Sequence, residues 1–449
     1  MSAGRIHPPV IPPQDRIKGF DPYVANLNDR TALYESTRCF MCFDAPCISG
    51  CPTRINIPEF IYRIKTGNYR GAAKVIRESN VFGGECGYVC PVERLCEVRC
   101  IRNNLNDEPV AIGLLQRFAY EKEKQKGLVK FDQAKRKNKK VAVVGAGPSG
   151  MSAAYELALK GYDVTVFDAN PAPGGLLLYG ILPWKVAWSV PENEVRNILE
   201  YGVEFTHKRV NDLSPLLKEY AAVFIGIGST VCARCRIAGE DLPGVFLAED
   251  FLCSVAKSIK GECKAPDLKG KRVAVVGGGD TALDAACASI RLGAAKVFLL
   301  YRRSVKEMPS VAYSRNQARE EGVEFMFLTA PTKVKGGKKV EGMECVRMEL
   351  GPKDASGRSG IKPMEGSDFT LDVECVIMAV GQEPDQGTLK SFGVAVKNGL
   401  VKVDDNYATS LKGVFAGGDA VNGGDTVVEA AAEGKKAAAA IDKYLSGGK

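Results

Sequence analysis

The same pattern of apolar and polar positions occurs at two places in the chain. Residues 141–144 and 273–276 are runs of four apolar residues, and each run leads through a glycine-rich turn into a helical pattern. A second, mainly apolar stretch follows each helix, at 162–167 and 296–300. Such runs are typical of strands buried on both faces, and strand, helix and strand form the βαβ unit of a parallel sheet. The sequence therefore predicts two α/β domains.

The turn of the first unit carries Gly145, Gly147 and Gly150. Glycines at this spacing allow a tight turn and let the backbone approach a pyrophosphate, which the N–H groups at the start of the helix then bind. The stretch 162–167 ends at Asp168, where a carboxylate can accept hydrogen bonds from the ribose of an adenine nucleotide. We expect this unit to be Rossmann-like and to bind FAD or an unphosphorylated dinucleotide.

The second unit repeats the turn but differs after its second strand, where two arginines replace the acidic residue. Guanidinium groups at this position suit a 2′-phosphate, so the sequence favours NADPH over NADH. NADH binding, or arginines that only end a surface strand, are the alternatives. The nucleotide-binding residues predicted in this unit are Gly277, Gly279, Asp280, Thr281, Arg302 and Arg303.

A third nucleotide-binding element is predicted near the C-terminus. Residues 414–419 have a strand pattern that ends in Gly418 and Asp419, and a helical pattern runs from Thr426 to Gly434. A carboxylate at such a strand end can reach the ribityl chain of a flavin, and the helix that follows points its N–H groups at the flavin ring. Because this element comes after the whole second unit, we expect an FAD domain that is split by an inserted NADPH domain.

Composition limits the other possibilities. The chain has 449 residues, a net charge of +8 and only two histidines, which excludes Ser-His-Asp hydrolysis and histidine-rich zinc sites. The basic run 135–140 precedes a strand and is interpreted as a solvated linker, so we expect no nucleic-acid binding. No run approaches the roughly 20 apolar residues that a membrane span needs. The start of the chain lacks a signal-peptide core, so we expect a cytoplasmic protein without membrane contact.

Eight of the fifteen cysteines lie in the first hundred residues. The first four follow the spacing C-x2-C-x4-C-x3-C-P, which is close to the bacterial ferredoxin spacing, and a second run of four again contains a Cys-Pro pair. In a reducing compartment such grouping favours metal binding over disulfides. Thiolates with almost no histidine nearby predict two [4Fe-4S] clusters, with a pair of all-thiolate zinc sites as the alternative. The eight residues are Cys39, Cys42, Cys47, Cys51, Cys86, Cys90, Cys96 and Cys100.

With these residues together, the chain resembles a family of FAD, NAD(P)H and [4Fe-4S] oxidoreductases. The family includes the small subunit of glutamate synthase and the N-terminal, electron-input part of dihydropyrimidine dehydrogenase, and the resemblance covers residues 31–445. Residues 38–53 and 84–91 are most similar to dihydropyrimidine dehydrogenase. Residues 301–309 and 318–322 are more similar to the glutamate synthase subunit.

The resemblance implies roles for individual residues. It adds Gly175 to the flavin site, although residues 182–185 depart from the usual sequence of the loop that follows it. It leaves Cys86 without a role. It implies one cluster on Cys39, Cys42, Cys47 and Cys100, and another on Cys51, Cys90, Cys96 and the unusual amide ligand Gln116.

These observations predict an α/β protein with a helical two-[4Fe-4S] domain followed by two Rossmann-like domains. The expected boundaries are 1–135 for the iron–sulfur domain, 136–250 and 371–449 for the two parts of the FAD domain, and 251–370 for the NAD(P)H domain. NAD(P)H would give hydride to FAD, and the clusters would carry electrons to a partner. Because the cofactors supply the chemistry, we expect no dedicated catalytic acid or base.

The partner is left open by the sequence. No segment remains to reduce an organic substrate, so the family implies a hetero-oligomer with a second catalytic subunit. The cluster region favours an FMN-containing pyrimidine reductase, and the alternatives are the glutamate synthase large subunit or a ferredoxin. An alternative of another class is a thiol-disulfide reductase that uses Cys232 and Cys235.

Overall fold

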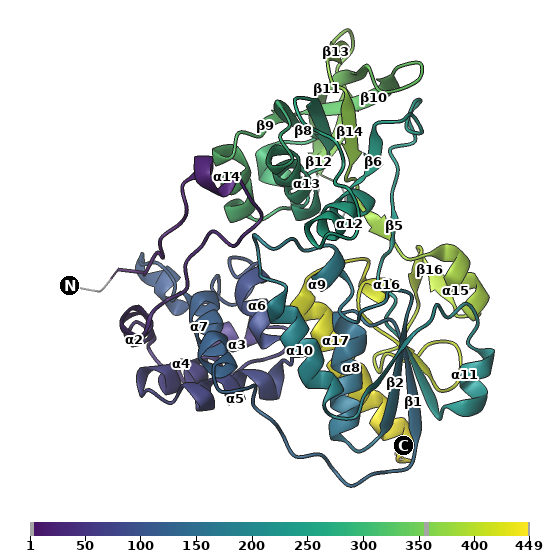
Figure 1. Cartoon of the computed structure of the whole chain (residues 1–449). Coiled ribbons are helices and arrows are strands. Elements are labelled where there is room, and N and C mark those ends of the chain that lie inside the picture. The colour runs from purple at the N-terminus through teal and green to yellow at the C-terminus, as the bar shows by residue number, and fades with distance from the viewer. Residues whose placement is uncertain (1–3, 354–358, 448–449) are drawn as a thin grey trace.

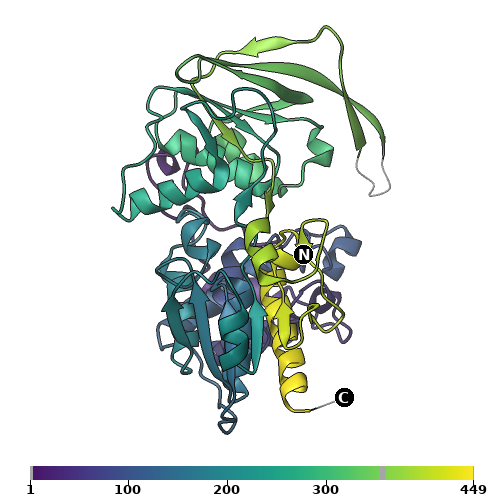
Figure 2. The ribbon, with the colours of Figure 1, turned by 90° about the vertical axis from the view of Figure 1, so that its right-hand side faces the viewer.

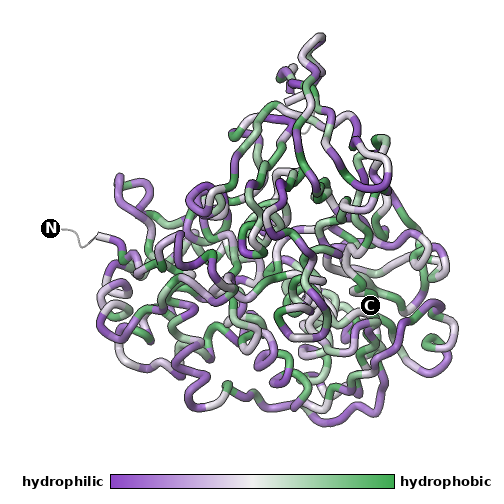
Figure 3. The backbone as a smooth tube through the Cα atoms, turned by 45° about the horizontal axis from the view of Figure 1, so that its top comes forward, coloured by the Kyte–Doolittle hydropathy of each residue, from purple (hydrophilic) through white to green (hydrophobic). Residues whose placement is uncertain are grey.

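The computed structural model of the chain describes residues 4–353 and 359–447. Figure 1 shows three parts: a helical N-terminal part, a first α/β part beside it, and a second α/β part above both. Hydrophilic segments follow much of the outline of the molecule, whereas hydrophobic segments run through the strands and helices that pack inside (Figure 3). Within the described residues, no helix is both long and apolar enough to cross a bilayer.

The N-terminal part is made of short helices. In α4 the buried residues are Ile57, Phe60, Ile61 and Ile64, which lie on one face because their spacing follows the helical repeat. The Asn56 side chain caps this helix by accepting a hydrogen bond from the Glu59 N–H. The helices of this part are α1 (Pro13–Arg16), α2 (Asp29–Thr37), α3 (Pro46–Ser49), α4 (Ile57–Lys65), α5 (Tyr69–Ser79), α6 (Gly83–Val89), the 3-10 helix η1 (Ile101–Leu105) and α7 (Ile112–Lys124).

The first α/β part contains a five-stranded parallel sheet in the order β18-β4-β1-β2-β3. Strand β18 comes from the C-terminal end of the chain, so this part is formed by two separate segments, as the sequence predicts. The strands are β1 (Lys140–Val144), β2 (Asp163–Asp168), β3 (Glu204–His207), β4 (Ala222–Ile225) and β18 (Val414–Ala416). The helices are α8 (Pro148–Leu159), α9 (Leu176–Tyr179), α10 (Ser189–Leu199), α11 (Ser214–Glu219), α15 (Gln386–Phe392), α16 (Asp419–Asn422) and α17 (Val427–Leu445).

The second α/β part is inserted between these segments. Its parallel sheet has the order β6-β14-β7-β8-β9 and therefore extends beyond both ends of the expected range 251–370. An antiparallel sheet, in which β11 pairs with β10, β12 and β13, projects from it (Figure 2). The elements are β6 (Val245–Leu247), α12 (Ala248–Ile259), β7 (Arg272–Val276), α13 (Asp280–Arg291), β8 (Lys296–Tyr301), η2 (Val305–Glu307), α14 (Ala312–Glu320), β9 (Glu324–Phe327), β10 (Thr329–Lys335), β11 (Gly342–Lys353), β12 (Ser359–Pro363), β13 (Phe369–Leu371) and β14 (Cys375–Met378).

Two short chain crossings connect the α/β parts. Strands β5 (Val231–Cys232) and β15 (Gln382–Glu383) pair antiparallel where the chain enters and leaves the inserted part (Figure 1). A second small pair, β16 (Val396–Lys397) with β17 (Leu400–Val401), lies beside the first α/β part.

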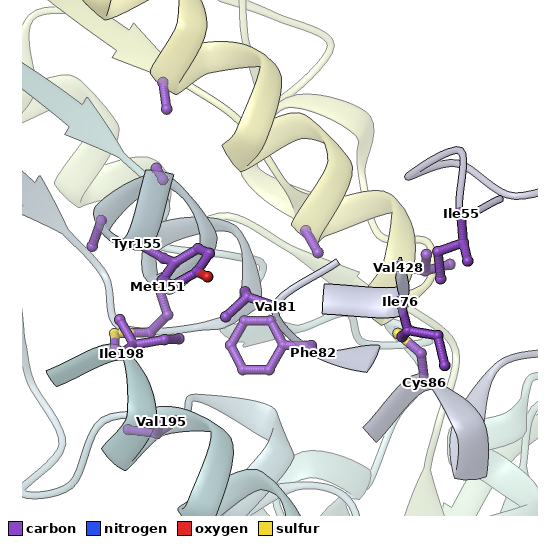
Figure 4. Packing of buried hydrophobic residues seen from close by; sticks show 14 of the residues in the cluster. Ile55, Ile76, Val81, Phe82, Cys86, Met151, Tyr155, Val195, Ile198 and Val428 are labelled. Atoms are coloured by element: carbon purple, nitrogen blue, oxygen red, sulfur yellow. The ribbon is translucent and has the colours of Figure 1, made fainter. Parts of the chain in front are cut away.

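One hydrophobic cluster joins the N-terminal part to the first α/β part. Figure 4 shows Val81 and Phe82 of the N-terminal part in the same cluster as Met151 and Ile198, and Val428 near Ile55. Because apolar area buried between two parts stabilises them together, these two parts form a single packed unit.

The C-terminal helix corrects one expectation. Residue Gly434 is not a helix end, because α17 continues to Leu445. A Cβ atom at Gly434 would lie 2.1 Å from the Ser149 backbone oxygen, so the glycine lets α17 pack directly against α8. Glycine at this position therefore serves close helix packing rather than helix termination.

Candidate functional site

The first glycine turn has the form that a nucleotide cradle needs. Gly145 has a φ of 106°, and a Cβ atom there would lie 2.2 Å from the Gly226 backbone oxygen. At Gly150 a Cβ atom would lie 1.9 Å from the Gly145 backbone oxygen, so both positions exclude a side chain. At Gly147, in contrast, no atom lies within 4 Å of such a Cβ. The turn is tightly packed on its inner side and open at Gly147.

The start of α8 is free to bind an anion. Its N-cap residue is Gly147, which provides no side-chain hydrogen bond to the first N–H groups of the helix. Asp168, at the end of β2, accepts hydrogen bonds from the backbone N–H groups of Ala146 and Asn170, each at 2.7 Å. These bonds fix the carboxylate beside the glycine turn, with lone pairs remaining for a ribose hydroxyl.

Two more predicted glycines, Gly175 and Gly418, approach the same turn, and a Cβ atom at Gly418 would lie 2.8 Å from the Ser149 Cβ. Gly175 has a φ of 56°, and its Cβ atom would lie 2.8 Å from the Gly147 Cα, so this segment packs against the glycine turn. The Gly418 N–H donates to Glu433 Oε2 at 2.5 Å. Burial raises the pKa of the carboxyl group of the next residue, Asp419. The Thr426 side chain accepts from the Glu429 N–H and begins α17.

The second turn repeats this design. Gly277 has a φ of 151°, and a Cβ atom there would lie 2.2 Å from the Ala379 backbone oxygen, whereas no atom lies within 4 Å of a Cβ at Gly279. Helix α13 begins with Asp280 and Thr281 and has no side-chain cap. This second helix start is therefore also open to a phosphate group.

The two arginines after β8 have different environments. Arg303 is half-buried and donates from Nε to the Ser359 backbone oxygen at 2.8 Å. Arg302 is exposed and makes no hydrogen bond or ion pair with the residues that the structure describes. Arg302 is therefore the one whose guanidinium is available for a charged group of a nucleotide.

A small cavity that is partly open to solvent lies in the N-terminal part. The predicted residues that line it are Cys39, Cys42, Cys47 and Cys100. Burial, together with the nearby thiols of Cys39, Cys100 and Cys42, raises the pKa of Cys47 to about 12. Grouped thiols of this kind are hard to ionise unless a metal centre balances their charge, so the donor set fits an iron–sulfur cluster.

A second small cavity is lined by the other predicted set. Its lining includes Cys51, Cys90, Cys96 and Gln116, and also Cys86. Gln116 donates from Nε2 to the Gly83 backbone oxygen at 2.7 Å, which commits the amide nitrogen and leaves Oε1 as the atom available to a metal. Cys86, which the sequence left without a role, accepts a hydrogen bond from Asn80 Nδ2 at 3.2 Å.

The two cavities are adjacent, and one of them reaches the first α/β part. Ile57 lines both cavities, and Val428, near the start of α17, lines the second. In residues 4–353 and 359–447 no group of three or more histidine, cysteine, aspartate or glutamate side chains is close enough to hold a single metal ion. The cysteines instead stand around open volumes.

Two features near these sites were not anticipated from the sequence. Trp184, in the loop after Gly175, is buried in the core of the second α/β part, so this loop connects the two α/β parts. Lys185 forms a half-buried ion pair with Asp284 of α13, at 2.6 Å. The departure from the family sequence at 182–185 was the only signal for this loop.

The cysteines of the thiol-reductase alternative face different partners. Cys232 Sγ donates to Glu249 Oε2 at 3.7 Å, and Cys235 Sγ lies 3.8 Å from Met378 Sδ. Burial raises the pKa of both thiols to about 11. Because the thiolate is the reactive form, this environment does not activate either thiol.

Two family descriptions match the chain. Residues 139–434 match the pyridine nucleotide-disulphide oxidoreductase family, and residues 16–128 match dihydropyrimidine dehydrogenase domain II, 4Fe-4S cluster. Two solved structures share the fold. FprA from Mycobacterium tuberculosis, in complex with NADPH, has a TM-score of 0.58 and 22% identity over 69% of this chain and 85% of that chain. Lactococcus lactis thioredoxin reductase has a TM-score of 0.52 and 20% identity over 69% of this chain and 100% of that chain.

Curated relatives extend over most of the chain. The glutamate synthase [NADPH] small chain of Escherichia coli (strain K12) is 36% identical over 98% of this chain and 97% of that protein. The NADP(+)-dependent formate dehydrogenase subunit beta of Moorella thermoacetica is 39% identical over 90% of this chain, but the match spans only 60% of that protein. The chain therefore belongs to the pyridine nucleotide-disulphide oxidoreductase family, as an NAD(P)H-dependent FAD oxidoreductase with a 4Fe-4S domain ahead of its nucleotide-binding region.

Proposed function

We propose that this chain is the electron-input subunit of a larger enzyme, which takes hydride from NADPH and delivers electrons through two [4Fe-4S] clusters to a partner. The observation that carries the proposal is that the sites adjoin one another in space. Helix α17 begins near the first glycine turn, and its residue Val428 lines the second cavity. The second cavity in turn adjoins the first, because Ile57 lines both. FAD, when bound, supplies the conversion of a two-electron hydride into single electrons.

The residues of this chain bind and position the cofactors. Gly147 and the start of α8 would hold the FAD pyrophosphate, and Gly279 and the start of α13 would hold that of NADPH, with Arg302 toward its 2′-phosphate. The two cysteine sets would hold the clusters, with Gln116 as a neutral ligand. No side chain is required to move a proton, since the role of the protein is orientation and electrostatics.

Electrons would leave from the first cavity. All four of its predicted cysteines are partly exposed, whereas Cys51 and Cys96 of the second cavity are buried. Phe43, between two of the first set, is 100% exposed, and Phe40 is 51% exposed. Large apolar side chains in solvent beside a redox centre support contact with another protein there.

We favour a glutamate synthase-type large subunit as the partner, since the small chain of that enzyme matches nearly the whole chain. The second candidate is a pyrimidine-reducing subunit, which the description of the family matched by residues 16–128 favours. The two are separated by NADPH oxidation with the product of a neighbouring gene. Glutamine plus 2-oxoglutarate supports the first, and uracil supports the second.

The direct test is an anaerobic spectrum of the purified chain before and after NADPH, with iron, sulfide and flavin counts. The proposal predicts bleaching of the flavin, followed by loss of cluster absorbance, with about eight iron atoms per chain for two four-iron clusters. A chain that binds four iron atoms or none after oxygen-free reconstitution would refute the two-cluster route.

A further inference from the structure

The first residues of the N-terminal part leave that part and cover the second α/β part. Residues 9–25 form a narrow loop whose two sides are paired, since Ile11 donates its N–H to the Tyr23 oxygen at 2.9 Å and Ala25 donates to the Pro9 oxygen at 3.0 Å. Val10 and Val24 form an antiparallel bridge between the sides. We call residues 9–25 the N-terminal strap; in Figure 1 it extends to the helices of the second α/β part, next to α14.

Arg16 fixes the strap to the C-terminal end of α14. Its side chain is 2% exposed, with Nε 2.8 Å from Glu321 Oε1 and Nη2 2.8 Å from Glu320 Oε2. Nη2 also donates to the Gln317 backbone oxygen at 3.2 Å. A buried guanidinium whose donors are used in this way is held in one orientation, since leaving any of them unpaired would be costly.

Aromatic residues of the strap extend the contact. The Tyr23 hydroxyl donates to Gln317 Oε1 at 2.6 Å and accepts from the Tyr313 hydroxyl at 2.7 Å. Phe20 lies against Trp184, with ring centroids 5.7 Å apart. Because Trp184 belongs to the loop between the two α/β parts, the strap contacts both the inserted part and its connection.

The opposite end of α14 is held by the loop of the second cysteine set. Glu93, three residues after Cys90, accepts a hydrogen bond from the Ala312 N–H at 2.5 Å, and Arg94 donates to the Pro309 oxygen at 3.3 Å. Helix α14 is therefore attached at both ends to the N-terminal part.

Helix α14 is also bonded to the second glycine turn. The Ser310 N–H donates to the Gly278 backbone oxygen at 3.2 Å, and the Val311 N–H donates to Asp280 Oδ1 at 3.4 Å. Both acceptors belong to the segment that is expected to hold the NADPH pyrophosphate. A displacement of α14 would therefore move the nucleotide turn relative to the first α/β part.

We propose that the N-terminal strap and Glu93 form a clamp on α14 that sets the position of the NADPH-binding turn over the flavin-binding part. Arg16 and Tyr23 are positioning residues in this arrangement, and they act on hydride transfer through α14. The inference rests on the proposed function for the reaction that it affects. The clamp itself is a contact between parts of the chain and can be measured without turnover.

The test compares Arg16→Ala and Tyr23→Phe with the control Lys18→Ala in the holoenzyme. Arg16→Ala should still fold, because Glu321 keeps its ion pair with Arg291 and the half-exposed Glu320 returns to water. Lys18 is exposed on the same strap and pairs only with Asp15 among the described residues. Arg16→Lys, which keeps the positive charge, should retain part of the wild-type rate of flavin reduction.

Stopped-flow flavin reduction at saturating NADPH should slow roughly tenfold to a hundredfold in Arg16→Ala, because a small misplacement of reacting groups costs this much. The dissociation constant of NADP+ should change less than about threefold, since no nucleotide contact is removed. A second readout needs no turnover: acrylamide quenching of the two tryptophans should increase as Phe20 leaves Trp184. Tyr23→Phe should produce a smaller change of the same kind.

Increased quenching with an unchanged reduction rate would overturn the clamp, since the strap would then be a structural cover only. Weaker NADP+ binding with an unchanged maximal rate would overturn it as well. Failure of the proposed function is distinguishable, because in that case NADPH would not bleach the flavin of the wild-type protein either.

Discussion

Arg77 and Glu194 form a buried ion pair across the boundary between the N-terminal part and the first α/β part. Arg77 Nη2 lies 3.2 Å from Glu194 Oε1, and the two side chains are 2% and 0% exposed. Arg77 also donates from Nε to both carboxylate oxygens of Glu123, and Glu194 accepts the N–H groups of Gly84 and Glu85 at the start of α6. One guanidinium therefore joins α5, α7, α10 and the helix next to the second cavity.

Arg77→Ala should lower the free energy of unfolding by about 3–5 kcal/mol, because it leaves two buried carboxylates without their cation. Urea unfolding, followed by fluorescence and by loss of cluster absorbance, measures the change. The matched control is Arg63→Ala, whose ion pair with Glu59 is 34% and 39% exposed; its effect should stay within about 1 kcal/mol. Equal losses of unfolding free energy in the two variants would contradict a stabilising role for the buried Arg77 ion pairs.

Gly434→Ala should destabilise the first α/β part by about 1–3 kcal/mol, because the added methyl group forces α17 away from α8. The obstacle is the Ser149 backbone oxygen, 2.1 Å from the new Cβ, and a backbone atom cannot move aside as a flexible side chain can. Thermal unfolding and FAD retention measure the effect. The control is Lys436→Ala, at an exposed position of the same helix, which should leave the stability nearly unchanged. Similar losses of stability in both variants would argue against the contact between α17 and α8 as the cause.

The sequence predicts the parts of this molecule that depend on local chemistry. The glycine turns at Gly145 and Gly277 are local, since tight backbone approach requires glycine there. Each of the two cysteine sets lines one cavity, and cluster binding by these sets stays a prediction. The contacts of Arg16 with Glu321, and of Arg77 with Glu194, join positions far apart in the sequence. Nothing local distinguishes these arginines from surface arginines. The true end of α17 was missed for the same reason, since Gly434 is explained only by α8.

Arg302→Ala should weaken NADPH binding by roughly tenfold to a hundredfold, because it removes a charge-assisted hydrogen bond worth about 1.5–3 kcal/mol. NADH binding should change little, so the preference between the two nucleotides should nearly disappear. Isothermal titration calorimetry with NADP+ and with NAD+ measures the two affinities and their ratio. Arg303→Ala is the comparison, since Arg303 already donates to Ser359. If Arg303→Ala loses more NADPH affinity than Arg302→Ala, Arg303 rather than Arg302 binds the 2′-phosphate.

Gln116→Cys should lower the reduction potential of one cluster, because a thiolate adds negative charge where the neutral amide stood. The cluster of the first cavity, which Gln116 does not line, should keep its potential and so provides an internal control in the same sample. An anaerobic redox titration followed by electron paramagnetic resonance resolves the two. Unchanged potentials for both clusters would show that Gln116 only holds the Gly83 oxygen through its amide nitrogen.

Glu249 links stability to pH at the crossing between the α/β parts. Burial, with smaller contributions from the charges of Asp250 and Asp419, raises its pKa from 4.5 to about 7 despite hydrogen bonds from Cys232 and Gln382. Because the folded protein holds this proton more tightly than the unfolded chain, the stability it contributes is complete below pH 4.5 and is lost as the pH rises to about 7.

Glu249→Gln, which cannot titrate, should therefore show a flatter dependence of the unfolding free energy on pH between 4.5 and 7 than the wild-type protein. Relative to wild type, the variant should gain stability as the pH rises through this window, with no further gain above it. Urea unfolding at a series of pH values measures both curves. Glu383→Gln, at an exposed position of β15, should run parallel to the wild type. If the Glu249→Gln curve is parallel too, the buried carboxyl does not titrate in this window, and the crossing between the two α/β parts is insensitive to pH.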